Sequence, residues 1–163
     1  MIFEHRFRVR YAETDTMGVA HHSSYLVWFE AGRVEFLRSL GFAWAEVEAS
    51  GYAHAVHEVH VQYRRAVRFD QLLTLCVAVV SAAGPRLVFG YRLYDAAELD
   101  ADPEAKPVAV ASTEMVWVTP SGRPTRLPAS HPLHPVLAGI ERHPHWGQGY
   151  APSGESRAAR ASR

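Results

Sequence analysis

The sequence predicts an α+β fold in which one antiparallel sheet covers one long helix. Three observations lead to this prediction. Residues 3–11 alternate between apolar and charged side chains, residues 23–40 carry apolar side chains at helical spacing, and four strand-like segments follow. This order, strand then long helix then four strands, suits a single sheet in a single domain.

The first half of the chain supplies the first strand and the helices. Period two over residues 3–11 is typical of a half-buried strand, and residues 13–18 form a turn. The helix over residues 23–40 has Ser23 or Ser24 as a candidate N-cap and Gly41 as a stop. Because apolar residues cover most of its circumference, we expect this helix to be buried. A short second helix is predicted over residues 43–49.

The second half is dominated by strands. Alternating or continuous apolar residues predict strands over 55–63, 72–81, 86–94 and 107–118. A turn is expected at 82–85, a polar hairpin loop at 95–106, and a short helix near 133–140. We expect one domain over residues 1–142 and a disordered tail over residues 143–163, which is rich in Gly, Ser, Arg and Ala.

The composition excludes several classes of function. Acidic and basic residues balance to a formal net charge of zero, which does not favour nucleic acid as a partner. No apolar run approaches the roughly 20 residues that span a bilayer, and the first residues lack the pattern of a signal peptide. The single cysteine, Cys76, lies in an apolar run and is expected to be a buried structural thiol. A reducing, cytoplasmic location is therefore expected.

The most informative segment is YAETDTMGVAHHSSY, residues 11–25, in which Asp15 precedes the start of the long helix. The free N–H groups of a first helical turn can bind developing negative charge. A carboxylate facing them could cleave an ester or thioester without Ser, Cys or a metal. The alternative is that Asp15 only caps a turn, where Asp is common.

This segment resembles the 4-hydroxybenzoyl-CoA thioesterase family, and most of all its acyl-CoA thioesterase branch associated with the Tol–Pal system. The matching positions are Asp15-x-x-Gly18-Val19, His22-x-x-Tyr25, Phe29-Glu30-x-x-Arg33 and, more weakly, Val61-x-Tyr63 with Asp70-x-Leu72. The resemblance covers residues 5–120 and implies the hotdog fold, a sheet wrapped around a central helix. It departs from the family's common residues at His21, Ser24 and Ala66-Val67.

The resemblance also implies roles for individual residues. Asp15 would attack the thioester carbonyl or activate water, the His22 N–H would bind the oxyanion, and Tyr25 would orient a reacting group. Gly18 and His21 are candidate substrate contacts. Coenzyme A carries phosphates, so the basic cluster after Tyr63 is a candidate for contacting them: Arg64, Arg65 and Arg68.

Glu30 is the rival catalytic acid. A second clade of hotdog thioesterases carries its catalytic glutamate nine residues after a histidine, and His21 and Glu30 have this spacing. Both acids could then lie near one site. The structural alternative is an i,i+3 ion pair between Glu30 and Arg33 that anchors the helix inside the sheet.

We expect a thioester hydrolase that acts on a small acyl-CoA, with an acyl carrier protein as a possible alternative carrier. The resemblance implies a homodimer or homotetramer with the site between two subunits, and neither a metal nor an organic cofactor. The histidines at 21, 22, 54, 57 and 60 lack dependable ligand spacing. Two other functions stay open: a hydroxyacyl-thioester dehydratase using His57 or Glu58, and a non-catalytic protein that binds acyl thioesters.

Overall fold

A computed structural model describes residues 1–147 of the chain. Its strands are β1 (Ile2–Arg8), β2 (Ala53–Tyr63), β3 (Leu72–Ala83), β4 (Arg86–Asp95) and β5 (Ala109–Val118). Its helices are η1 (Tyr11–Glu13), α1 (Ser24–Ser39), α2 (Trp44–Ala49), α3 (Ala96–Ala101), α4 (Leu133–Gly139) and η2 (Pro144–Gly147). The predicted α+β class is therefore confirmed.

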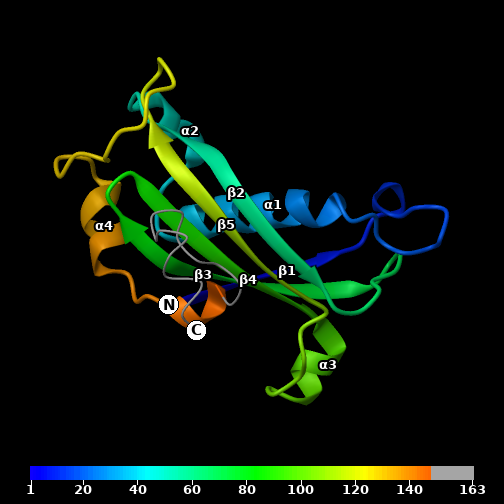
Figure 1. The fold of residues 1–163 in the computed structure, drawn as a ribbon. Helices are drawn as coiled ribbons and strands as arrows, with labels where there is room; N and C mark the ends of the chain where they lie inside the picture. Colours follow the sequence, from blue (N-terminus) through cyan, green and yellow to red (C-terminus); the bar gives the residue numbers. More distant parts are fainter. Residues whose placement is uncertain (148–163) are drawn as a thin grey trace, which may run out of the picture.

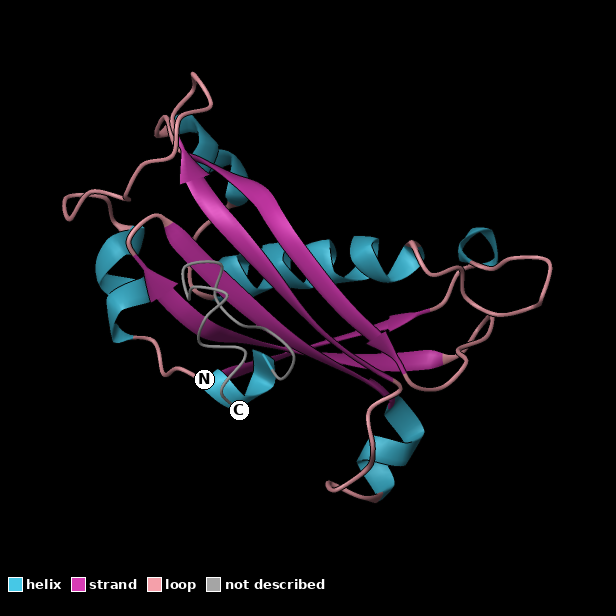
Figure 2. Cartoon of the chain, viewed as in Figure 1, coloured by secondary structure: helices cyan, strands magenta, loops and turns pink. Residues whose placement is uncertain are grey.

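The five strands form one antiparallel sheet in the order β1-β3-β4-β5-β2. Figure 1 shows the sheet curving around α1, which runs along its inner face. Figure 2 shows α2, α3 and α4 near the ends of the strands, whereas η2 packs against the middle of β4, where Trp146 lies beside Gly90. The central strands β3 and β4 are almost entirely buried because they are covered on both faces.

Close packing holds α1 against the sheet. A Cβ atom at Gly32 would lie 2.6 Å from the Cδ2 atom of Leu75, so only glycine lets the helix approach β3 this closely. The Phe29 ring stacks on the Tyr91 ring with 4.6 Å between centroids. Gly41, at a φ of +87°, ends the helix as predicted, with its N–H donating to the Arg38 carbonyl.

One side of α1 is exposed, so the prediction that the helix is buried around most of its circumference is wrong for the single chain. Leu26 and Val27 are 43% and 55% exposed. Leu26 shares a hollow with Val56 and Val59 of the edge strand β2, which are also exposed. The predicted helix is present, but the sheet covers only part of its apolar surface.

A second correction concerns residues 95–106, which are not a hairpin loop throughout. They begin with the helix α3, and the Asp95 side chain caps it by accepting hydrogen bonds from the N–H groups of Ala97 and Glu98. The charged composition concealed this short helix. Of the predicted tail, residues 144–147 form η2, and residues 148–163 lie outside the part that the structure describes.

Candidate active site

The loop between η1 and α1 fixes the backbone around Asp15. The Asp15 N–H donates to the Val19 carbonyl at 2.9 Å, and the Gly18 N–H donates to the Asp15 carbonyl at 2.9 Å. Gly18 has a φ of +70°, a conformation that favours glycine and explains why it stands at this turn. The Asp15 Oδ1 atom accepts the Met17 N–H at 2.8 Å, which leaves Oδ2 without a hydrogen bond within residues 1–147.

The start of α1 lies beside this loop. The expected serine cap is not formed, because neither Ser23 nor Ser24 accepts a capping hydrogen bond. Instead, the Ser24 hydroxyl donates to the Glu13 carbonyl at 2.9 Å, and the Ser23 hydroxyl contacts His21 Nδ1 at 2.7 Å. The His22 N–H makes no hydrogen bond within residues 1–147, whereas the His22 carbonyl accepts the Tyr63 hydroxyl at 3.0 Å.

Glu13, which sequence reasoning missed, joins the loop to both neighbouring elements. Its carboxylate accepts hydrogen bonds from the Arg10 guanidinium, the Arg10 N–H and the Trp28 indole N–H, at 2.7–2.9 Å. Its main-chain carbonyl accepts the His21 N–H at 2.8 Å. Burial alone would raise the pKa of Glu13, but the hydrogen bonds from Arg10 and Trp28 outweigh it and hold that pKa below its usual range. One hint of this role is visible in the sequence: Glu13 is an acidic residue between the first strand and Asp15.

A surface pocket of about 350 Å³ opens beside the Asp15 loop and the α1 start. It brings together residues from the loop, the helix start and the segment after β2. They are Asp15, Val19, Ala20, His22, Tyr25, Tyr63, Arg64, Arg65, Ala66 and Val67. Of the predicted catalytic residues, Asp15, His22 and Tyr25 share this pocket and Glu30 does not.

Tyr25 is buried at the base of this pocket. Its ring packs against Trp28 at 4.7 Å and meets Tyr63 edge-on at 4.9 Å, measured between ring centroids. Burial raises the pKa of both the Tyr25 and the Tyr63 hydroxyl, so both remain proton donors at neutral pH. Tyr63 therefore belongs to the site, although sequence reasoning gave it no role.

Glu30 lies elsewhere on α1. It lines a separate hollow with Leu26, Phe29, Arg33, Val56, Val59 and Thr113. The predicted ion pair between Glu30 and Arg33 is not formed; the Arg33 guanidinium instead donates to the Tyr91 hydroxyl at 2.9 Å. Within one chain the two candidate acids thus occupy different pockets, and the expectation that they share one site does not hold there.

The three arginines of the predicted phosphate-binding cluster have different surroundings. Arg65 donates two hydrogen bonds to the Glu98 carboxylate, at 2.8 and 2.6 Å, and this pairing raises its pKa. Arg68 donates to the Gly18 carbonyl at 3.3 Å and so supports the Asp15 loop. In the described part of the chain, the Arg64 side chain donates one long hydrogen bond, at 3.5 Å, to the Gln62 side chain. It is therefore the member of the cluster best able to meet an anion.

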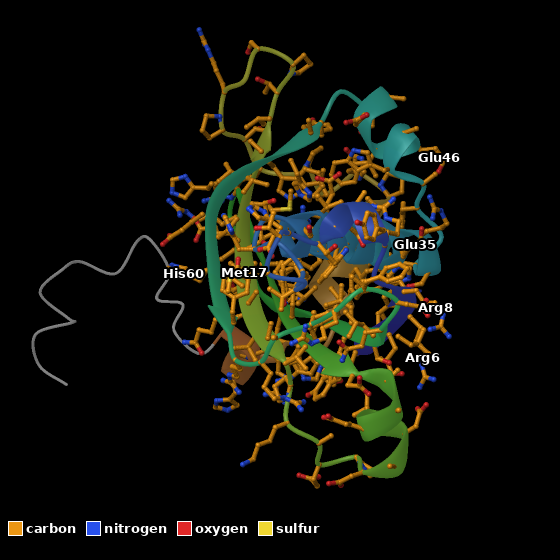
Figure 3. The ribbon with its side chains drawn as sticks, turned by 90° about the vertical axis from the view of Figure 1, so that its right-hand side faces the viewer. Arg6, Arg8, Met17, Glu35, Glu46 and His60 are labelled. Atoms are coloured by element: carbon orange, nitrogen blue, oxygen red, sulfur yellow. The ribbon has the colours of Figure 1, made fainter. Side chains whose placement is uncertain are left out.

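Arg64 also lines a neighbouring pocket of about 370 Å³, in which basic and aromatic side chains outnumber the single acidic one, Glu104. Arg92 and Lys106 contribute positive charge, and Trp146 lies under the Arg92 guanidinium at 4.6 Å. These residues come from β4, the loop before β5 and η2, and their separation in sequence hid the cluster. Arg6 and Arg8 on the first strand project from another side (Figure 3) and lie near Asp100 and Asp70.

The residues considered for other chemistries lie outside the Asp15 pocket. His57 is 3.9 Å from the buried Glu114 carboxylate, and Glu58 contacts His60 at 2.6 Å. His21 is exposed, and its ring packs against His22. In residues 1–147, no group of three or more His, Cys, Asp or Glu side chains is arranged to hold a metal ion. None of the helices described there combines the length and apolar character needed to cross a bilayer.

Comparison with known proteins gives the following relatives. The chain is 34% identical over 95 residues to the acyl-CoA thioester hydrolase YbgC of Escherichia coli, covering 58% of this chain and 71% of that protein. It is 34% identical over 89 residues to YneP of Bacillus subtilis, and there it spans 64% of the relative's length.

Solved structures extend the similarity over most of the chain. A hypothetical protein, TT1821, from Thermus thermophilus aligns with a TM-score of 0.74 and 31% identity, covering 85% of this chain and 98% of that one. A DHNA-CoA thioesterase from Staphylococcus aureus aligns with a TM-score of 0.74 and 25% identity, covering 84% and 88%. The predicted hotdog fold is confirmed. The model of the thioesterase-like superfamily matches residues 9–138, so the chain belongs to that superfamily.

Proposed function

We propose that this protein hydrolyses the thioester of a small acyl-CoA, with Asp15 as nucleophile or general base. The observation that carries the proposal is the pocket that Asp15 and His22 line together at the start of α1. The names of the relatives support the reaction class. We place the protein in the Tol–Pal-associated branch because of the motif from Asp15 to Arg33.

The chemistry needs little beyond these groups. A thiolate is a good leaving group, so a carboxylate suffices to attack the carbonyl carbon or to take a proton from water. The His22 N–H, which has no acceptor within residues 1–147, would donate to the carbonyl oxygen as it becomes negative. The positive end of α1 favours the same charge. The Tyr63 hydroxyl donates to the His22 carbonyl and thereby fixes the peptide between His22 and Ser23, next to the peptide that carries the His22 N–H.

The coenzyme would extend from this pocket into the neighbouring basic one, which shares Arg64. Arg64, Arg92 and Lys106 would meet its phosphates, since guanidinium and ammonium groups bind phosphate oxygens. The Trp146 ring offers an aromatic surface to the base. Arg65 and Arg68 would instead maintain the walls of the site, because they already bind Glu98 and Gly18.

The exposed apolar side chains on α1 and β2 support assembly into a dimer or tetramer. Leu26 of α1 and Val56 and Val59 of the edge strand β2 form an exposed apolar surface, where a second chain could extend the sheet. In such an assembly Glu30, on this surface, would lie at the subunit boundary.

A thiol-release assay with a panel of acyl-CoAs, from short aliphatic to aromatic, tests the proposal. We expect free coenzyme A and the free acid from at least one acyl class, with the activity eluting as a dimer or tetramer. The same acyl groups on an acyl carrier protein would show which carrier is preferred. Water loss without free thiol would indicate a dehydratase, and binding without turnover a non-catalytic protein; either result contradicts the proposal.

Glu13→Gln should lower kcat about tenfold with little change in KM. The amide keeps one acceptor oxygen but removes the charge and the second acceptor that hold Arg10, so the loop would shift relative to the helix start, whereas the pocket walls would remain. Steady-state kinetics with the preferred acyl-CoA measures the effect. Glu35→Gln is the matched control. Glu35 also forms an i,i+3 ion pair with an arginine, Arg38, but on α1 and outside the Asp15 pocket. Equal kcat values for the two variants would contradict the positioning role of Glu13.

A further inference from the structure

Another concave site, the distal pocket, lies at the opposite end of the molecule from the Asp15 loop. It has a volume of about 260 Å³ and is formed by the β3–β4 turn, the end of β5, the loop after β5, and α4 with the residues that follow it. Figure 1 shows α4 at one end of the sheet and the loop before α1 at the other. The proposed thioester hydrolysis does not use this site.

The distal pocket is lined by basic side chains and by no acidic ones among the described residues. The basic side chains are those of Arg86, Arg126, His134 and Arg142. Arg86 is bound to the buried Glu114 carboxylate, so its charge is balanced within the fold. Arg126 and Arg142 have no such carboxylate partner within residues 1–147. Because the whole chain is neutral, this local excess of positive charge is a feature of the pocket itself.

Arg126 and Arg142 differ in how firmly the fold holds their guanidinium groups. Arg142 is held in place by donating to the carbonyls of Ile140 and Leu137 at the end of α4, at 3.0 and 2.5 Å. Burial lowers its pKa, as expected for a cation that lacks a counterion. Arg126 makes no side-chain hydrogen bond within residues 1–147, and its Nε lies beside Gly84, 3.7 Å from where a Cβ would be. One guanidinium is fixed and the other is free to close over a ligand.

The rest of the lining is apolar. Trp117, Leu127 and Leu137 are buried members of the core cluster that reach this pocket from beneath. The fold leaves only 3–7% of these three side chains accessible, and an apolar group on a ligand would cover that part, whereas an inorganic ion would not. Guanidinium groups above an apolar floor suit an amphiphilic oxyanion.

We propose that the distal pocket binds a small organic anion, a carboxylate or phosphate monoester carried on a short apolar group, between Arg126 and Arg142. The ligand's oxyanion would accept hydrogen bonds from both guanidinium groups, and its apolar group would lie on Leu127, Leu137 and Trp117. This site is independent of the proposed hydrolysis, because none of its residues lines the Asp15 pocket.

Thermal unfolding of the full chain with hexanoate, hexyl phosphate or inorganic phosphate tests this proposal. At about a hundredfold excess over Kd, the preferred hexyl compound should raise Tm by about 5 °C or more. Which hexyl compound acts identifies the head group. Arg126→Ala should abolish the shift, whereas Arg123→Ala, which removes one charge from the same loop outside the pocket, should retain it.

Arg142→Met provides a second variant, because it keeps an apolar side chain of similar length while removing the fixed guanidinium. It should weaken binding at least tenfold in calorimetric titration. Three results would overturn the proposal: no shift with either hexyl compound, an equal shift with inorganic phosphate, or a shift that survives Arg126→Ala and disappears in Arg92→Ala, which would move the ligand to the other basic pocket.

Discussion

Asp15→Asn is expected to lower kcat for acyl-CoA hydrolysis by about 10²–10⁴-fold, the range typical for loss of a general base. The amide keeps the Oδ1 acceptor that binds the Met17 N–H, so the loop should retain its shape. It removes the negative charge needed either to attack the carbonyl carbon or to accept a proton from water. KM should change little, because the coenzyme contacts that we propose lie on Arg64, Arg92 and Lys106.

Glu30→Gln is the matched control for this experiment, since it makes the same chemical change on α1 outside the Asp15 pocket. We expect Glu30→Gln to retain most of the activity. Circular dichroism and size-exclusion chromatography of both variants would separate a catalytic defect from misfolding or dissociation. An active Asp15→Asn protein together with an inactive Glu30→Gln protein would transfer the catalytic role to Glu30.

Acidification is expected to destabilise the fold through His54, well before the carboxylates titrate. Both ring nitrogens of His54 are buried without a hydrogen-bond partner in the described residues, and the ring lies between Trp44 and Trp117. Burial, with a smaller contribution from the positive charge of Arg33, lowers the pKa of His54 to about 3. In the unfolded chain a histidine titrates near 6.5.

The sign of the effect follows from this lowered pKa. Above about pH 6.5 both states hold neutral His54, and the full stability is present. As the pH falls toward 3, only the unfolded chain takes up the proton, so the free energy of unfolding decreases by about 1.4 kcal/mol per pH unit. At pH 5 the expected loss from this residue is about 2 kcal/mol relative to pH 8.

Urea unfolding of the wild type and of His54→Phe at pH 8 and pH 5 measures this contribution. The phenyl ring keeps the aromatic packing and cannot be protonated, so the variant should lose about 2 kcal/mol less stability between the two pH values. His60→Gln, which alters an exposed histidine on the same strand, should behave like the wild type. Identical pH dependence in wild type and His54→Phe would show that His54 does not supply the effect.

The sequence by itself determined the five strands, the long helix and the segment around Asp15, although it concealed the short helix α3. Alternation over residues 3–11 and helical spacing over residues 23–40 reflect which side chains must face a core, and this is a local property. Gly18 and Gly41 marked backbone turns with positive φ, which the structure contains. The motif around Asp15 could be found because its residues are neighbours in the chain.

Only the tertiary structure decided which of these residues meet. It separated Glu30 from Asp15: Asp15 lines the pocket beside the start of α1, whereas Glu30, further along α1, lines a hollow shared with β2. It paired Arg65 with Glu98 and brought Arg64 near Arg92, contacts between strands and loops that lie far apart in sequence. Burial and charge pairing depend on how the sheet curves around the helix. No local pattern encodes that curvature, and for this reason the roles of Glu13, Tyr63 and the distal arginines emerged only from the folded chain.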